Sequence, residues 1–114
     1  MDDIEIKQKV MNELQNMGFN FKHVGTIYLL ETIQIVYNSK NPQIFKCIEK
    51  NIYPQVAEKH CKKVSTVKSD IIKATDYMYE QNLLEKKKTD IYYNLYPKMT
   101  PKTVINTIIL KITA

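Results

Sequence analysis

Apolar residues recur at helical spacing from the start of the chain. Ile6, Val10, Leu14 and Met17 follow one another at intervals of three or four positions. Side chains at these intervals share one face of an α-helix, and the glycine that follows Met17 is typical of a helix end. The pattern predicts a first helix over residues 2–17 that packs by this face.

The stretch from residue 25 to residue 37 is apolar on nearly all sides. In a helix, Ile27, Leu30 and Ile33 would share one side, while Leu29 and Val36 would lie on the other. A helix that is apolar all round is buried by other elements. We therefore expect a second helix that lies in the core.

Two further helices are predicted on either side of a central hairpin. Residues 38–42 have the composition of a turn, and the apolar spacing after them predicts a short third helix over residues 44–51. Thr100-Pro101 begins a last helix. Its apolar residues form a face broad enough to close the core or a dimer: Val104, Ile105, Ile108, Ile109 and Ile112.

The stretch from Pro54 to Tyr79 predicts two helices joined by a tight turn. Proline suits the first turn of the first helix, which runs for about two turns. Cys61-Lys62-Lys63 fills the short turn that a helix-turn-helix needs, and Ser65 is the expected N-cap of a longer second helix. The whole pattern predicts an all-α fold, in which residues 1–114 form a single domain, a compact bundle of about six helices containing a helix-turn-helix.

The second helix of this hairpin has an apolar face and a polar face. Val67, Ile71, Ala74 and Met78 share the apolar face, which should pack against the first helix. The opposite face and the preceding turn are rich in lysine and in short polar side chains, as is typical of a helix that enters a DNA groove. The candidate DNA-binding residues are Lys62, Lys63, Ser65, Thr66, Lys68, Ser69, Ile72 and Lys73.

Two positions depart from the usual helix-turn-helix pattern. His60 stands where such motifs usually bury a leucine or a phenylalanine, and Cys61 stands where glycine commonly makes the turn. An ordinary helical hairpin with a solvated basic face therefore stays open as an alternative to a DNA-binding unit.

The composition is that of an ordinary globular domain, with 44% apolar and 25% charged residues. No apolar run in the sequence approaches the roughly 20 residues of a membrane span, and the acidic start does not resemble a signal peptide. We therefore expect a cytoplasmic protein. The sequence has no Gly-rich phosphate loop and no other catalytic motif, so we expect neither an enzyme nor a cofactor.

The cysteines and histidines do not have the spacing of a metal site. Cys47, Cys61, His23 and His60 could form a cluster only through tertiary contacts, because the sequence shows none of the close ligand pairs that metal sites usually have. We therefore expect no metal, with packed thiols and a half-exposed histidine instead.

The net charge of +5 comes from the second part of the chain. Residues 1–50 carry six lysines and six acidic residues, whereas residues 51–114 carry eleven lysines and six acidic residues. A localised basic surface favours a polyanion such as double-stranded DNA.

All 17 cationic side chains are lysine. Bases would therefore be read by lysine, hydroxyl and methyl groups or through DNA shape, without the arginine contacts common at guanine. Abundant Lys, Ile, Asn and Tyr indicate an A+T-rich genome, which explains the lack of arginine without functional selection.

The segment after the hairpin allows two interpretations. The second helix is expected to loosen at residues 80–82 into a lysine-rich loop over residues 85–90, which is either solvated or in contact with phosphate. The aromatic residues 91–96 are expected in the core, although such rings can also stack on single-stranded bases.

A glycine-led apolar helix that ends in Val-Tyr-Asn precedes a Tyr-Pro-x-x-Ala-x-Lys helix-turn-helix, and this combination is typical of one family. The residues that carry the resemblance are Gly18, Gly25, Tyr28-Leu29, Glu31 to Ile33, Val36-Tyr37-Asn38, Tyr53-Pro54, Ala57, Lys59, Ser65, Val67 and Ile71. On these residues, nearly all of the chain resembles the C-terminal effector domain of the stage-zero sporulation protein A family, the master response regulators of endospore-forming bacteria.

The resemblance implies an all-helical domain of about six helices that binds promoter DNA through the second helix of the hairpin and contacts RNA polymerase. The family carries arginines that reach base edges at the positions of Ser69 and Ile72, so a different operator is expected here. The family also has an N-terminal receiver domain whose phosphorylation drives dimerisation, and we expect no receiver domain in this chain.

Two functions follow from these observations. In the first, the protein is a sequence-specific DNA-binding transcription regulator, with RNA polymerase and a second copy on DNA as further candidate partners. In the alternative, it is a receiver-less relative that acts by protein–protein interaction with a full-length regulator or RNA polymerase, through the tyrosine-rich segment or the last helix. Exposed apolar area on the last helix would favour the alternative.

Overall fold

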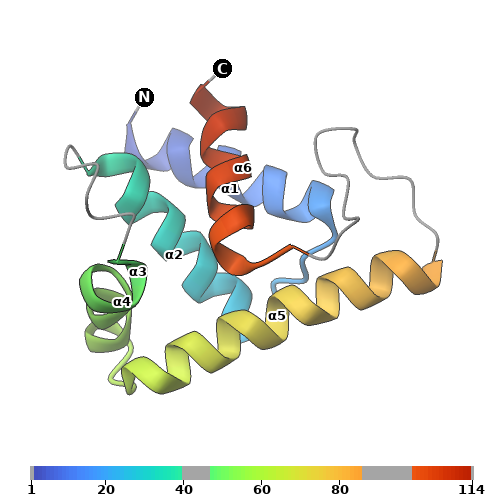
Figure 1. Cartoon of the computed structure of the whole chain (residues 1–114). Helices are drawn as coiled ribbons and strands as arrows, with labels where there is room; N and C mark the ends of the chain where they lie inside the picture. Colours follow the sequence, from blue (N-terminus) through green and yellow to red (C-terminus); the bar gives the residue numbers. More distant parts are fainter. Residues whose placement is uncertain (1, 40–46, 86–98, 114) are drawn as a thin grey trace.

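The computed structural model describes residues 2–39, 47–85 and 99–113, with the backbone alone at 83–85. All the regular secondary structure among these residues is helical (Figure 1). The helices are α1 (Asp3–Met17), α2 (Val24–Asn38), α3 (Ile48–Asn51), α4 (Tyr53–Lys59), α5 (Val64–Glu85) and α6 (Pro101–Thr113). The predicted all-α bundle of about six helices is confirmed.

Helix α2 lies at the centre of the bundle. It contacts α1, α4, α5 and α6, and Figure 1 shows it crossing the middle of the domain with α5 running beneath it. Leu29, Leu30 and Ile33 are all buried. The prediction that this apolar helix lies in the core is therefore confirmed.

A glycine sets the distance between α2 and α5. A Cβ atom at Gly25 would lie 1.9 Å from the carbonyl oxygen of Asp70 and 3.1 Å from the Cβ of Ala74. A residue without a side chain is required where two backbones approach this closely. Gly25 therefore lets α5 pack directly against the start of the core helix.

The end of α1 is a hydrogen-bonded reversal around a left-handed glycine. Gly18 has a φ of 104°, its N–H donates to Gln15 O at 3.0 Å, and the N–H of Phe19 donates to Leu14 O at 3.0 Å. This pair of bonds is the Schellman motif, in which glycine avoids the strain that a Cβ would cause. Phe19 is buried beside the turn. The predicted end of the first helix is confirmed.

Helix α5 is longer than expected. Its predicted apolar face is confirmed, because Val67, Ile71, Ala74 and Met78 are all buried. The expected loosening at residues 80–82 is wrong, since the helix continues to Glu85. The lysines at 86–88 and the aromatic segment 91–96 lie outside the described residues.

A side chain near the end of α5 explains the extra length. The amide nitrogen Nδ2 of Asn82 donates to Met17 O at 2.8 Å and to Met78 O at 2.9 Å. The first bond satisfies a carbonyl at the end of α1, where intrahelical partners run out. Asn82 thus joins two helix ends, and this tertiary contact favours continued helix.

Helix α6 packs against the core through its apolar face. Four residues of its predicted apolar face are buried, Val104, Ile105, Ile108 and Ile112, while Ile109 is half-buried. The helix contacts α1, α2 and α5. The start of α1 and the end of α6 lie on the side of the domain away from α5 (Figure 1). Among the described helices, none has the length and apolar character that crossing a membrane requires.

Candidate nucleic-acid interface

The turn between α4 and α5 repeats the hydrogen bonds found at the end of α1. The N–H of Cys61 donates to Glu58 O at 3.2 Å, and the N–H of Lys62 donates to Ala57 O at 2.9 Å. Cys61 has a φ of 54°, so a residue with a Cβ occupies the left-handed position of the motif. Glycine is common at this position of helix-turn-helix motifs, and the left-handed backbone of Cys61 is the conformation that favours glycine.

The start of α5 corrects the predicted cap. The helix begins at Val64, one residue before the expected N-cap, so Ser65 lies within the first turn and does not cap it. Instead, the carbonyl of Lys63 accepts the N–H groups of Thr66 at 3.0 Å and Val67 at 3.1 Å. The early start leaves the exposed hydroxyl of Ser65 on the helix surface.

An ion-pair cluster fixes the end of α4 to the core helix. The carboxylate of Glu31, with its side chain 14% exposed, contacts Lys59 Nζ at 2.9 Å through Oε1 and His60 Nε2 at 2.7 Å through Oε2. The His60 ring lies edge-on to Tyr28, with ring centroids 5.0 Å apart. His60 therefore has a polar partner where related motifs bury an apolar side chain, and it holds the hairpin in place on α2.

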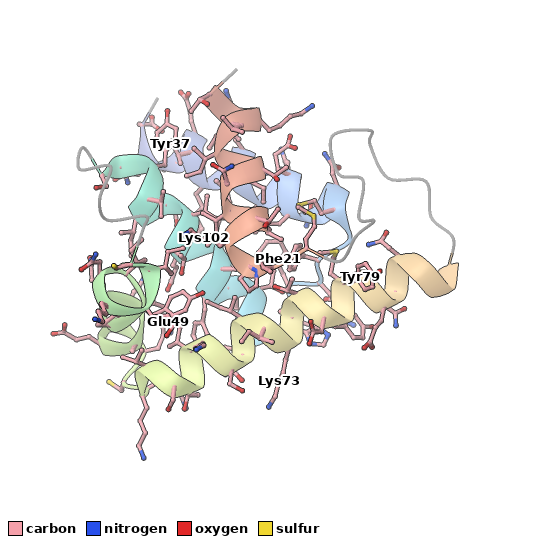
Figure 2. The ribbon with its side chains drawn as sticks, viewed as in Figure 1. Phe21, Tyr37, Glu49, Lys73, Tyr79 and Lys102 are labelled. Carbon is pink, nitrogen blue, oxygen red and sulfur yellow. The ribbon has the colours of Figure 1, made fainter. Side chains whose placement is uncertain are left out.

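The apolar faces of α4 and α5 meet as the sequence predicts. Val56 and Ala57 of α4 are buried, and α4 contacts α5. With this face turned inward, the opposite face of α5 points to solvent. Figure 2 shows Lys73 extending from α5 away from the body of the domain.

The structure places most of the candidate residues on this outward surface. The turn lysines and the outward positions of α5 are exposed, Thr66 is half-buried on one flank, and the Ile72 side chain is 37% exposed. The exposed members are Lys62, Lys63, Ser65, Lys68, Ser69, Ile72 and Lys73. They span about the first three turns of α5 and the turn before it.

The chemistry of the outward face changes further along α5. Asp76, half-buried, and Glu80, exposed, follow Lys73 at helical spacing on the same side. Carboxylates repel the phosphates of a nucleic acid. The surface suited to a polyanion is therefore confined to the first part of α5 and its turn.

Lys68 differs from the other candidates because it turns toward α3. Its Nζ lies 2.9 Å from Glu49 Oε1, and the two side chains are 47% and 58% exposed. An ion pair this exposed contributes little, about 0–1 kcal/mol, so Lys68 can exchange partners readily. Lys68 thus belongs to a flank of α5, separate from the turn lysines.

The flank near Lys68 contains charged residues that the sequence analysis did not single out. Lys50 of α3 and Lys102 of α6 line the same cleft as Lys68, together with Tyr53 of α4. Burial, with a smaller effect of the nearby Glu49 carboxylate, raises the pKa of Tyr53 to about 12. Its hydroxyl therefore stays protonated to higher pH than that of an ordinary tyrosine. The three lysines Lys50, Lys68 and Lys102 are far apart in sequence, and no spacing pattern connects them.

The alternative of a metal cluster is not supported. The described residues contain no group of three or more His, Cys, Asp or Glu side chains arranged to hold an ion. The expectation of packed thiols is wrong, because Cys47 and Cys61 are both exposed free thiols. His60, with its side chain 28% exposed, is held by Glu31.

The comparison with known protein families agrees with this arrangement. A family model described as "Sporulation initiation factor Spo0A C terminal" matches residues 10–112, which includes α4, the turn and α5. Searches of the curated proteins and of the solved structures returned no match. The chain therefore belongs to the family of the Spo0A C-terminal domain, a sporulation-related family of DNA-binding effector domains.

Proposed function

We propose that this protein is a sequence-specific transcription regulator that places the first part of α5 in the major groove of promoter DNA. The observation that supports the proposal is the pairing of a buried apolar face on α5 with an outward face of small polar and basic side chains directly after a lysine-bearing turn. A helix held in this way by a preceding helix is the unit that enters a major groove in helix-turn-helix proteins.

The two parts of the surface have different roles in this proposal. Lys62 and Lys63 bind phosphates, because flexible ammonium groups at the exposed turn act as point charges. Ser69, Ile72 and Lys73 face the base edges, with Ser65 and Thr66 near the start of the helix. The apolar surface of Ile72 matches the methyl group of thymine. We therefore expect a preference for A+T-rich sites.

A single domain makes few phosphate contacts, so one copy binds weakly. Two half-sites one helical turn apart, about 34–36 Å, would let two copies bind side by side and strengthen binding. RNA polymerase is the further partner that we propose for the DNA-bound protein.

Fluorescence anisotropy with labelled duplexes tests this function. Promoter fragments from the source genome should bind more tightly than random duplexes of the same length and base composition, and two correctly spaced half-sites more tightly than one. The control is Lys9→Gln, which removes an exposed lysine on α1 and should leave the affinities unchanged. Equal affinity for promoter and random DNA would contradict sequence-specific regulation.

A second candidate function is supported by exposed apolar side chains at the other side of the domain. Leu110 of α6 is 62% exposed and Ile4 of α1 is 80% exposed, on helices that contact each other. Such a surface suits protein–protein interaction with a full-length regulator or RNA polymerase. Leu110→Asp should then abolish co-purification with that partner while DNA affinity stays the same. Asn106→Asp, an exposed change one turn earlier, is the matched control.

A further inference from the structure

A cleft of about 360 Å³ lies beside the first part of α5, between α3 and the start of α6. Its apolar lining includes Ile48, Ile72, Pro101 and the ring of Tyr53. Small-molecule sites in proteins occupy roughly 300–1,000 Å³ and combine apolar walls with a few polar groups. The cleft therefore has the size and the lining of a site for a small ligand.

The charges around the cleft define the ligand. Lys50, Lys68 and Lys102 come from three different helices and line the same space, together with the carboxylate of Glu49. In Figure 2, Glu49 and Lys102 lie above the first part of α5, on the opposite side of that helix from Lys73. The excess of ammonium groups favours an anion. Tyr53 also lines this space, and its hydroxyl group can donate a hydrogen bond.

The ion pair between Lys68 and Glu49 connects this cleft to the outward face of α5. The two groups lie 2.9 Å apart and are both about half exposed, so an incoming anion can replace Glu49 as the partner of Lys68 at little cost. Ile72 lines the cleft and is also part of the candidate base-reading surface. A ligand in the cleft would thus cover Ile72, which is proposed to face the base edges, and would engage Lys68 on the flank beside it.

We propose that this cleft binds a small amphipathic anion, a molecule with an apolar ring system and one carboxylate, sulfonate or phosphate group, and that its binding competes with DNA. Ligand binding is independent of the proposed function, whereas the competition rests on it. The ring system lies against Ile48, Ile72 and Pro101, and the anionic group lies among the lysines.

The first experiment measures ligand binding without DNA, with anilinonaphthalene sulfonate as the probe. Cys47 lines the cleft and Cys61 does not, so each thiol can be followed alone in Cys61→Gly and Cys47→Ser proteins. Saturating probe should slow alkylation of Cys47 by iodoacetamide several-fold and leave Cys61 unchanged. Equal slowing of both thiols, or of neither, would overturn the proposed site.

Charge variants show whether the lysines hold the anion. The double variant Lys50→Gln and Lys102→Gln should weaken probe binding about tenfold, as expected for the loss of two partly exposed charge contacts. The matched control, Lys7→Gln with Lys9→Gln on α1, removes the same charge from exposed positions outside the cleft. If both double variants weaken probe binding equally, the effect comes from net charge alone and the proposal is overturned.

The second experiment adds promoter DNA. The probe should displace DNA from the wild-type protein at concentrations that protect Cys47, and the cleft double variant should need about tenfold more probe. Simultaneous binding of probe and DNA would overturn the competition. If random duplex DNA protects Cys47 and the probe does not, the cleft contacts DNA phosphates and the proposed small-ligand site is overturned. If the probe protects Cys47 but the protein binds no DNA, the result contradicts only the proposed function.

Discussion

The two parts of α5 differ in what their side chains contact. Up to Lys73, the outward positions carry serine, isoleucine and lysine, and the face opposite them packs on α4 and α2. From Asp76 onward the outward positions carry carboxylates, and Asn82 reaches across to the end of α1. The first part of α5 thus presents a surface suited to DNA, and the second part holds the helix against the core. The comparison predicts that changes in the second part affect stability, and changes in the first part affect DNA recognition.

Asn82→Ala should have the largest effect, and on stability alone. The change removes the side-chain donor to Met17 O at the end of α1, and leaving such an acceptor without a partner costs about 1–3 kcal/mol. Met78 O keeps its backbone partner within α5. Urea unfolding should show this loss, while the preferred DNA sequence stays the same. Gln81→Ala, one residue earlier and without a role in this contact, is the control. A changed sequence preference in Asn82→Ala would remove the distinction between the two parts of α5.

Ile72→Arg should change DNA recognition and leave stability nearly unaltered. The side chain is partly exposed, and an arginine there can form a bidentate contact with guanine, with a discrimination of about 1–3 kcal/mol. Selection from random duplexes, with wild type and variant in parallel, should show new guanine preference at one base step. Identical selected sequences from both proteins would mean that this face does not read bases, and would favour the protein–protein interaction alternative.

Lys63→Gln should lower the salt dependence of DNA binding. One lost phosphate contact reduces the slope of log K against log salt by roughly 0.9 and weakens all sequences alike. Lys9→Gln removes the same charge from an exposed position on α1 and removes no phosphate contact, so its slope should equal that of the wild type. A Lys63→Gln protein with altered sequence preference and an unchanged slope would have lost a base contact instead.

Cys61→Gly should give the smallest effect, a modest gain in stability. A left-handed residue with a Cβ is strained by roughly 1–2 kcal/mol, partly offset by the greater freedom of glycine in the unfolded chain. Thermal unfolding should therefore show an increase in Tm with DNA affinity maintained. Cys47→Gly, at a φ of −125°, relieves no such strain and should not raise the Tm. Loss of stability in Cys61→Gly would show that the thiol packs in a way that outweighs the strain.

The sequence by itself determined the helices and their faces. The buried residues of α1, α5 and α6 are those that recur every three or four positions, because a helix brings these positions to one side whatever it packs against. The end of α1 at Gly18 and the turn at Cys61 also followed from local chemistry, since left-handed backbone is a property of single residues. The candidate surface on α5 was predictable for the same reason: it lies opposite the apolar face.

Only the tertiary structure decided the contacts between helices. Asn82 extends α5 because the end of α1 lies beside it, Glu31 holds His60 across 29 positions, and Lys68 turns to Glu49 instead of remaining with the turn lysines. Ser65 lost its expected capping role when α5 began one residue earlier. The cleft lysines come from three helices that no periodicity relates. Spacing along a chain reports neighbours within one helix, whereas these partners meet only after the helices have packed.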